Sequence, residues 1–351
     1  MQVAVTNNSI DFVPFTFRQA IVVNEVGDAS VMRYVQDQPI PAIGENQVLV
    51  KNHFAGLNFI DTYHRSGLYK RELPFILGQD GGGEIATLGP GVTDWSVGDK
   101  VAYIADESYA EYTVVTIGKL VKVPDNIDLQ VAVAAMVQGL TAHYLVTSAH
   151  AGLIQKGEWC LIYSVGSGTG QWAAQMAKLR GYKVIGTCSK DKEEMAKTVG
   201  CDELIVLDSP NGKSYADYAC IDLPAKIMEI TNNAGCKCVI DGIGKSTWEI
   251  SLSILAVRGI WISFGNASGV VPELSPLRFT PKSAFLTRPK LGDYIATQEE
   301  LDERWSEMVD WITTGKLSIS IDCAFPLADA AKGHKYIEGG HTRGKVLFQL
   351  I

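Results

Sequence analysis

An apolar run that breaks into glycines at residues 160–170 restricts the possible folds of this chain more than any other stretch. It reads CLIYSVGSGTG and leads into an amphipathic segment that continues to Lys178. Glycine lets the backbone approach a pyrophosphate closely, and the free N–H groups and dipole of a first helical turn stabilise negative charge. The pattern predicts a strand, a phosphate-binding turn and a helix, with the turn formed by Gly166, Ser167, Gly168, Thr169 and Gly170.

The surrounding sequence extends this turn to a dinucleotide-binding unit. A second apolar strand is expected at residues 183–187, so that strand, turn, helix and strand fit within about thirty residues. The spacing is not the usual Gly-x-Gly-x-x-Gly, because Val165 and Ser167 stand where the first two glycines are expected. A tight turn that binds no ligand is the alternative.

The residues after the second strand indicate which dinucleotide would bind. A site for NAD has a carboxylate there for the ribose 2′-hydroxyl, whereas a site for NADP has small residues and cations for the 2′-phosphate. Here Ser189 and Lys192 favour NADPH as the cofactor. Asp191 could instead be an NAD-type acid, or the cap of a helix expected at residues 192–199. A solvent-exposed helix start would equally account for Lys190 and Lys192.

Length, charge and cysteine content set the class of protein. A chain of 351 residues suits two domains, and its net charge of −8 argues against broad attraction to nucleic acid or anionic membranes. The seven cysteines are an odd number in a chain of this size, which indicates reduced thiols and a cytoplasmic location. No run of about eighteen apolar residues occurs, and Lys and Arg are absent before residue 18, so we expect neither a membrane span nor a targeting peptide.

The chain divides into a β-rich part and an α/β part. Turn residues separate short strands between residues 17 and 124, and a helical pattern at 128–149 leads into alternating strands and helices. This order predicts an α/β fold in which a doubly wound parallel sheet of the Rossmann type lies beside a β-barrel domain. The expected strands are 19–24, 47–53, 82–88, 100–104, 110–115, 203–207, 237–241 and 260–264, and the later helices are 224–232, 247–256, 299–314 and 329–337. The predicted divisions are an N-terminal extension at 1–16, the first part of the barrel domain at 17–142, the cofactor domain at 143–290, and a segment returning to the barrel at 291–351.

Several motifs resemble those of one protein family. Residues 56–69 read GLNFIDTYHRSGLY, and residues 138–142 read QGLTA. Together with residues 241–248 and 263–269, they are similar to zeta-crystallin-type quinone oxidoreductases, which are zinc-independent medium-chain dehydrogenases and reductases. The resemblance covers nearly everything from Gln19 to the C-terminus and implies a GroES-like barrel beside the Rossmann domain.

The resemblance also implies where substrate and cofactor bind. The catalytic residues would be Asn58, Asp61, Tyr63, Arg65 and Tyr69, and the cofactor-binding residues would include Gln138, Thr141, Phe264 and Asn266. Tyr69 can donate a hydrogen bond to a developing oxyanion without changing its own charge. The alternative is an ordinary tyrosine on the barrel surface. Asp61 and Arg65 are four residues apart, so an ion pair within one helix would account for both of them.

The metal ligands of zinc-dependent relatives are missing. Those enzymes need a cysteine in the first motif and a histidine where this chain has Gln79. Catalytic zinc needs about three convergent ligands, so we predict no metal. Without a Lewis acid, hydride transfer from NADPH to a quinone is favoured over alcohol oxidation. Reduction of enone or alkenal double bonds would use the same site. By resemblance, a cofactor-binding protein with an AU-rich RNA-binding or structural role is a third reading, which the net charge does not favour.

Two positions depart from the family pattern near the 2′-phosphate. Relatives carry an arginine where this chain has Gly340, and Arg343 is the candidate substitute. Relatives often have a tyrosine after the strand that contains Ile205, where this chain has Leu207 and Asp208. We therefore expect a smaller preference for NADPH than in those relatives.

The end of the cofactor sheet suggests how copies of the chain associate. Its last predicted strand includes the apolar residues Ile260, Trp261 and Ile262. An apolar edge strand needs to be covered, and members of this superfamily commonly pair there. The expected partner is a second copy of the chain, in a homodimer joined through the strand at residues 259–264.

Overall fold

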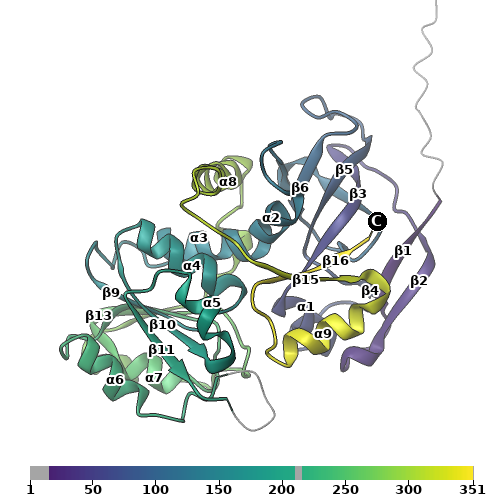
Figure 1. Ribbon diagram of the computed structural model, residues 1–351. Helices are drawn as coiled ribbons and strands as arrows, with labels where there is room; N and C mark the ends of the chain where they lie inside the picture. Colours follow the sequence, from purple (N-terminus) through teal and green to yellow (C-terminus); the bar gives the residue numbers. More distant parts are fainter. Residues whose placement is uncertain (1–15, 210–215, 351) are drawn as a thin grey trace, which may run out of the picture.

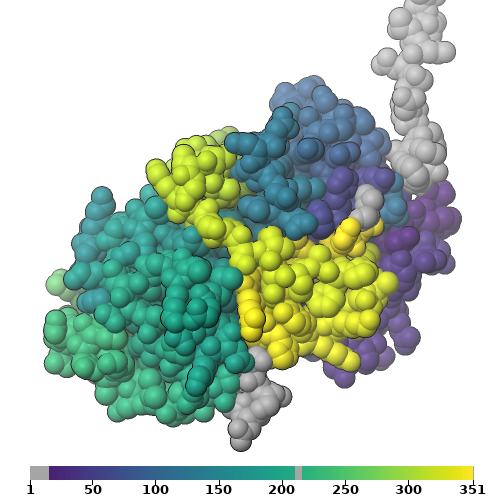
Figure 2. All heavy atoms as spheres, in the orientation of Figure 1, coloured from purple at the N-terminus to yellow at the C-terminus, as the bar shows by residue number. Residues whose placement is uncertain are grey.

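The computed structural model describes residues 16–209 and 216–350, which form two lobes (Figure 1). One lobe is β-rich, and the other has a parallel sheet covered by helices, as predicted. In Figure 2 the C-terminal segment, drawn in yellow, lies over the junction between the lobes. The predicted N-terminal extension, apart from Thr16, lies outside the described residues.

The β-rich lobe contains two sheets. Its strands are β1 Phe17–Val23, β2 Met32–Pro39, β3 Gln47–Leu57, β4 Phe75–Ile76, β5 Asp80–Leu88, β6 Lys100–Ile104, β7 Tyr112–Thr116, β8 Leu120–Lys122, β15 Ile321–Pro326 and β16 Lys345–Gln349, and its helices are α1 Phe59–Ser66 and α9 Ala330–Glu338. The seven-stranded sheet has the order β15-β16-β3-β5-β6-β8, with β7 paired to β3, and the three-stranded sheet has the order β2-β1-β4. Because β16 pairs with β3, the tail of the chain returns to this lobe.

The second lobe, called the cofactor lobe because it contains the predicted dinucleotide-binding unit, is built on a six-stranded sheet. Its strands are β9 Trp159–Ile162, β10 Lys183–Ser189, β11 Glu203–Leu207, β12 Cys236–Asp241, β13 Leu255–Ser263 and β14 Phe285–Thr287, and its helices are α4 Gly168–Leu179, α5 Glu193–Lys197, α6 Leu223–Ile230 and α7 Trp248–Ser253. The strand order is β11-β10-β9-β12-β13-β14, and every pair is parallel. The order reverses between β9 and β12, where ligands bind in sheets of this kind.

Two features of this sheet correct the sequence predictions. The strand expected as the edge, at residues 259–264, is not the edge, because β14 pairs with β13 along its outer side. The helix expected at 247–256 ends at Ser253, since Leu255 already begins β13 and pairs with Cys236 of β12.

Both faces of the parallel sheet are buried, which explains the continuous apolar run of β9. Cys160 and Ile162 belong to the apolar core that includes α4, whereas Leu161 belongs to the core that includes α6. Successive side chains of a strand point to opposite faces, so a strand covered on both sides needs apolar residues at every position.

A long helical stretch lies between the lobes. It consists of α2 Leu129–Ala134, a π-helical turn at Ala135–Gly139, and α3 Leu140–Thr147, and α8 Gln298–Thr313 packs beside it. By length and composition alone the stretch could cross a membrane, which the sequence analysis did not expect, but 72% of it is buried inside the protein. The apolar residues of this stretch are therefore explained by their burial in the core.

Short 3₁₀ turns lie at Ala29–Val31, Ile117–Lys119, Lys190–Lys192, Pro276–Lys282, Leu291–Asp293 and Leu327–Asp329.

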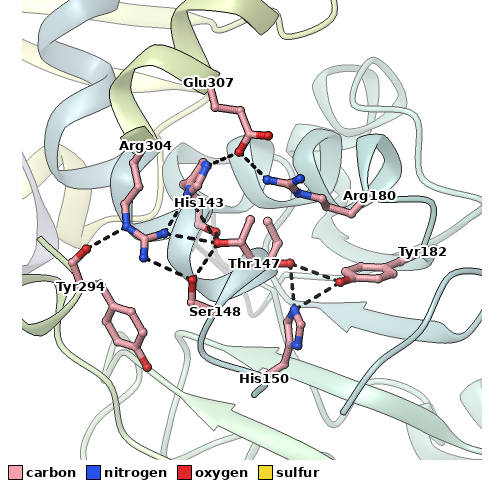
Figure 3. Close-up of polar contacts among 10 residues, drawn as sticks. His143, Thr147, Ser148, His150, Arg180, Tyr182, Tyr294, Arg304 and Glu307 are labelled. Carbon is pink, nitrogen blue, oxygen red and sulfur yellow. Dashed lines mark hydrogen bonds and ion pairs between the residues drawn. The ribbon is translucent and has the colours of Figure 1, made fainter. Parts of the chain in front are cut away.

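A polar cluster fastens α8 to the cofactor lobe (Figure 3). Nε2 of His143, on α3, lies 2.7 Å from Oε2 of Glu307 on α8, and Glu307 also pairs with Arg180. Nη1 of Arg304 lies 3.0 Å from Nδ1 of His143, and its Nε donates to the backbone oxygen of Tyr294 at 2.8 Å. Burial lowers the pKa of His143 to about 4; the hydrogen bond with Glu307 opposes this shift, and the charges of both arginines add to it.

We expect this histidine to make the free energy of unfolding depend on acid pH. His143 stays neutral in the folded protein down to about pH 4, whereas the unfolded chain protonates it near pH 6.5. The unfolded state therefore binds more protons in this window, so stability that is present above pH 6.5 is lost as the pH falls toward 4. Chemical denaturation should show His143→Gln losing about 2 to 3 kcal/mol less than the wild type across the window. Parallel pH profiles for the two proteins would contradict this role.

Candidate active site

A cleft of about 1270 Å³ runs between the two lobes. Its wall combines the end of β3, the start of α1, the glycine turn, the π-helical turn and residues 288–293. The predicted site residues that line it are Asn58, Tyr63, Tyr69, Gln138, Thr141, Gly166, Ser167, Gly168, Thr169, Gly170, Ser189, Lys192 and Phe264. The predicted residues that lie outside its lining are Asp61, Arg65, Asn266 and Arg343.

The glycine turn connects β9 to α4 along the cleft. A β-carbon at Gly166 would lie 2.7 Å from Cβ of Lys192, and a β-carbon at Gly170 would lie 2.2 Å from the backbone oxygen of Ser164. Both positions therefore need glycine. The helix begins after Ser167 with uncharged residues, so the free N–H groups and the dipole of α4 face the cleft unopposed and can hold a phosphate.

Two buried polar atoms of the cleft wall have no hydrogen-bond partner among residues 16–209 and 216–350. They are Oε1 of Gln138 and Oγ of Ser189, whose side chains are 8% and 3% exposed. Leaving such a group unpaired costs about 1 to 3 kcal/mol, which a ligand with complementary polar groups can recover. Gln138 faces the start of α4, since a β-carbon at Gly168 would lie 2.9 Å from its Nε2. The site therefore fits a polar ligand that extends along the turn.

Lys192 gives the Ser189 end of the cleft a positive charge. Burial lowers the pKa of Lys192 to about 8; the carboxylate of Asp322 opposes that shift, and the charge of Arg343 adds to it. Arg343 is therefore close to Lys192 although it does not line the cleft, and its backbone N–H donates to Asp322 at 3.0 Å. Asp191, the alternative acid for an NAD site, is exposed and lies outside the cleft lining.

Tyr218 is a cleft residue that the sequence analysis missed. Its hydroxyl lies 3.2 Å from Oγ of Ser164, at the entrance to the glycine turn. Leu207, at the position where relatives often have a tyrosine, is fully buried. A tyrosine thus reaches this part of the cleft from a different segment, eleven residues further along the chain than Leu207.

At the other end of the cleft, two tyrosines of the β-rich lobe contact the cofactor lobe. The hydroxyl of Tyr69 lies 3.0 Å from Nη2 of Arg288, which donates to it, and the hydroxyl of Tyr63 accepts from the backbone N–H of Asn266 at 3.0 Å. The Asn266 side chain satisfies its neighbours best with its oxygen 2.9 Å from Nη2 of Arg288 and 3.2 Å from the Tyr69 hydroxyl. Asn266 was predicted to bind the cofactor; in this structure its side chain bridges the lobes, and the cofactor contact stays a prediction.

Arg288 is a second cleft residue that was not predicted. Its Nη1 donates to the backbone oxygens of Ser263 and Gly265, at 2.9 and 3.0 Å. These bonds fix a positive charge beside the Tyr69 hydroxyl. A phenol held next to a cation is well suited to donate a hydrogen bond to an oxygen that gains negative charge.

Asp61 and Arg65 were predicted as catalytic residues, with an ion pair between them as the alternative. They do not pair with each other, and neither lines the cleft. Asp61 closes a capping box at the start of α1, so its Oδ2 accepts from the backbone N–H of Asn58, at 2.8 Å, and from the Tyr109 hydroxyl, at 2.9 Å. Arg65, in the last turn of α1, pairs with Glu338 of α9. Both side chains hold α1 in place.

Asn58 lines the cleft, but its side chain is bonded on the buried side. Its Oδ1 accepts from Nζ of Lys345 at 2.8 Å, and its Nδ2 donates to Oδ1 of Asp80, also at 2.8 Å. Asp80 and Lys345 are fully buried and form an ion pair of 3.1 Å. Because both polar atoms of the Asn58 side chain already have partners, we assign Asn58 a part in shaping the cleft rather than a free hydrogen bond for a substrate. Burial, aided by the negative charge of Asp80, raises the pKa of the nearby Asp61 to about 7.

Comparison with known proteins agrees with this architecture. Residues 44–155 match the alcohol dehydrogenase GroES-like domain, and residues 200–347 match the zinc-binding dehydrogenase family. Within the described parts of the chain, no three His, Cys, Asp or Glu side chains form a group that could hold a metal ion.

Individual relatives resemble the chain over most of its length. It is 38% identical to a quinone oxidoreductase of Pseudomonas aeruginosa, over 92% of this chain and 96% of that protein. It is 34% identical to a 2-haloacrylate reductase of a Burkholderia species, over 87% and 91% of the two chains. The crystal structure of Escherichia coli quinone oxidoreductase complexed with NADPH matches with a TM-score of 0.87 at 33% identity, over 95% of this chain and 100% of that one. The predicted family is therefore confirmed: the chain belongs to the zeta-crystallin-type quinone oxidoreductases of the medium-chain dehydrogenase/reductase superfamily.

Proposed function

We propose that the chain is an NADPH-dependent quinone reductase that works without a metal. The observation that carries the proposal is the continuity of the cleft. One end has the glycine turn with Ser189 and Lys192, and the other has the Tyr69–Arg288 pair. A dinucleotide bound along the turn would therefore have its reactive end close to a hydrogen-bond donor for a carbonyl oxygen.

The residues present fit NADPH as the cofactor. The N-terminus of α4 would hold the pyrophosphate, Ser189 and Lys192 would hold the 2′-phosphate with Arg343 near them, and Gln138 and Thr141 would contact the nicotinamide. The unpartnered atoms of Ser189 and Gln138 would then both gain partners. Two solved relatives, one mycobacterial and one from Escherichia coli, are described as complexed with NADPH. When bound, NADPH supplies a hydride.

The acceptor end of the cleft would bind and polarise a quinone. Tyr69 would release its hydrogen bond to Asn266 and donate its hydroxyl hydrogen to one carbonyl oxygen instead, while Arg288 stabilises the negative charge that develops there. Tyr63 packs edge-on against Tyr69, with ring centroids 5.2 Å apart, and so keeps the Tyr69 ring in position. The acceptor takes up one hydride and one proton from solvent and leaves as a hydroquinone.

Reduction of a carbon–carbon double bond next to a carbonyl is the second candidate. Relatives of this chain include a 2-haloacrylate reductase and prostaglandin reductase-3, and the same tyrosine could polarise an enone. Purified protein should be given NADPH with a panel of ortho- and para-quinones and with an alkenone, and turnover should be compared. We expect quinones to give the higher kcat/KM. Turnover of the alkenone alone would favour the second candidate.

We also propose a homodimer joined through β14, the outer strand that lies beside β13 in the cofactor sheet. Phe285 and Leu286 on this strand are each 46% exposed. An apolar edge strand can pair with a second copy of itself and continue the sheet. The dimer interface expected at residues 259–264 is therefore assigned to β14 instead.

Leu286→Lys is expected to convert the dimer to a monomer, because two lysines would meet across the paired edges. Size-exclusion chromatography with light scattering should give about twice the chain mass of 38.1 kDa for the wild type and the chain mass for the variant. Leu277→Lys is the matched control, since Leu277 is 78% exposed and lies outside β14. A monomeric wild type, or a dimeric Leu286→Lys, would refute this interface.

A further inference from the structure

Asp80 is a fully buried carboxylate that joins three segments of the cleft wall. Its Oδ2 lies 3.1 Å from Nζ of Lys345, at the start of β16, and its Oδ1 accepts from Nδ2 of Asn58, the N-cap of α1. Its Oδ2 also accepts from the backbone N–H of Val137 at 3.1 Å. One side chain therefore ties β5 to α1, to β16 and to the helical stretch between the lobes.

The contact with Val137 falls inside the π-helical turn Ala135–Gly139. Such a turn accommodates an extra residue, which changes the direction in which its side chains project. The next residue, Gln138, projects into the cleft toward the start of α4, with Oε1 buried and unpartnered among the described residues. The direction of the Gln138 side chain thus depends on a turn whose backbone is hydrogen-bonded to Asp80.

The Asp80–Lys345 pair has space beside β3 because residue 56 is a glycine. A β-carbon at Gly56 would lie 2.2 Å from Oδ1 of Asp80 and 2.5 Å from Nζ of Lys345. An apolar pair of similar size would often be as stable as a buried ion pair, so stability alone does not explain why charged groups occupy this position. A carboxylate has enough acceptor sites to take the N–H groups of Asn58 and Val137 together, and Lys345 neutralises its charge.

We propose that Asp80 and Lys345 are a positioning pair that sets the π-helical turn so that Gln138 meets the nicotinamide half of the bound cofactor. The proposal rests on the proposed NADPH site. Neither residue touches the cofactor; both act through Gln138. The pair therefore governs the affinity for the nicotinamide half of the cofactor and leaves the adenosine half unaffected.

Binding titrations with two probes test this proposal without turnover. NADPH carries both halves of the cofactor, whereas 2′,5′-ADP carries the phosphorylated adenosine half and no nicotinamide. We expect Gln138→Ala to weaken NADPH binding by about tenfold, the value of one ordinary hydrogen bond, and to leave 2′,5′-ADP binding unchanged. The charge-neutral double variant Asp80→Asn/Lys345→Met should weaken NADPH alone by a similar factor. Combining all three substitutions should weaken NADPH no further than Gln138→Ala, because the effects share one route.

Two further variants and the behaviour of the wild type make the outcome decisive. Asp80→Glu keeps the charge and shifts the carboxylate by one methylene, so it should also weaken the binding of NADPH and not that of 2′,5′-ADP. This variant replaces the double variant in the test if the double variant does not fold. Lys178→Met/Asp202→Asn removes an ion pair of the cofactor lobe outside the cleft and should leave both probes unchanged. Equal weakening of both probes, or additive effects with Gln138→Ala, would overturn the proposal. A wild type that binds neither probe would instead refute the proposed cofactor site.

Discussion

Tyr69→Phe is expected to lose about 100-fold in kcat for quinone reduction, because removing one donor to a developing oxyanion costs about 10² to 10³ in rate. The hydroxyl lies 3.0 Å from Nη2 of Arg288, so its loss leaves that guanidinium without the phenol through which it polarises the acceptor. The ring and its packing on Tyr63 remain. The affinity for NADPH should not change, since Tyr69 lies at the acceptor end of the cleft.

Steady-state kinetics with saturating NADPH, together with a binding titration, would check this expectation. Tyr34→Phe is the matched control, because the Tyr34 hydroxyl bonds to Gln19 in the β-rich lobe and Tyr34 lies outside the cleft lining. The control should keep the wild-type kcat. If Tyr69→Phe also keeps it, Tyr69 is a structural residue of the interface between the lobes.

Lys192→Glu is expected to weaken NADPH binding by about 1 to 3 kcal/mol relative to NADH, or about 5- to 150-fold. The lysine lines the cleft next to Ser189, where a 2′-phosphate would lie, and burial raises the cost of leaving charges unpaired there. Glutamate would replace attraction by repulsion. NADH lacks the 2′-phosphate, so its binding should change much less.

The neighbouring residue supplies a strict control for this substitution. Lys190→Glu makes the same change of charge two residues away, on an exposed side chain outside the cleft lining. It should alter the ratio of NADPH to NADH affinity by less than about threefold, because exposed charges are screened by solvent. If Lys192→Glu weakens the binding of NADPH and NADH equally, Lys192 does not contact the 2′-phosphate.

The fold could be predicted wherever local sequence carries the signal. Strand β11 was expected at residues 203–207 and has those bounds, because the apolar residues 204–207 are buried or half-buried in the sheet. Strand β2 was not predicted, since all of its residues are exposed or half-buried and it lacks an alternating apolar face. The π-helical turn was not predicted either, because Ala135–Gly139 reads as an ordinary helical sequence.

The site was predictable only in part, for a different reason. The glycine turn, Ser189 and Lys192 lie within one continuous unit of sequence, and all of them line the cleft. Asp61 and Arg65 were assigned by resemblance, but each finds its strongest partner in local capping or in α9. Lys345 was missed because its partner Asn58 lies 287 residues away, a contact that only the fold creates.

The central proposal is that a hydride passes from NADPH to a quinone bound in this cleft. The most direct measurement is quinone-dependent oxidation of NADPH by the purified protein, with NADPH and NADPH deuterated at C4 compared side by side. We expect one hydroquinone formed for each NADPH oxidised, a slower rate with the deuterated cofactor, and a rate about 100-fold lower in Tyr69→Phe. Absence of quinone-dependent NADPH oxidation across a panel of ortho- and para-quinones would contradict it.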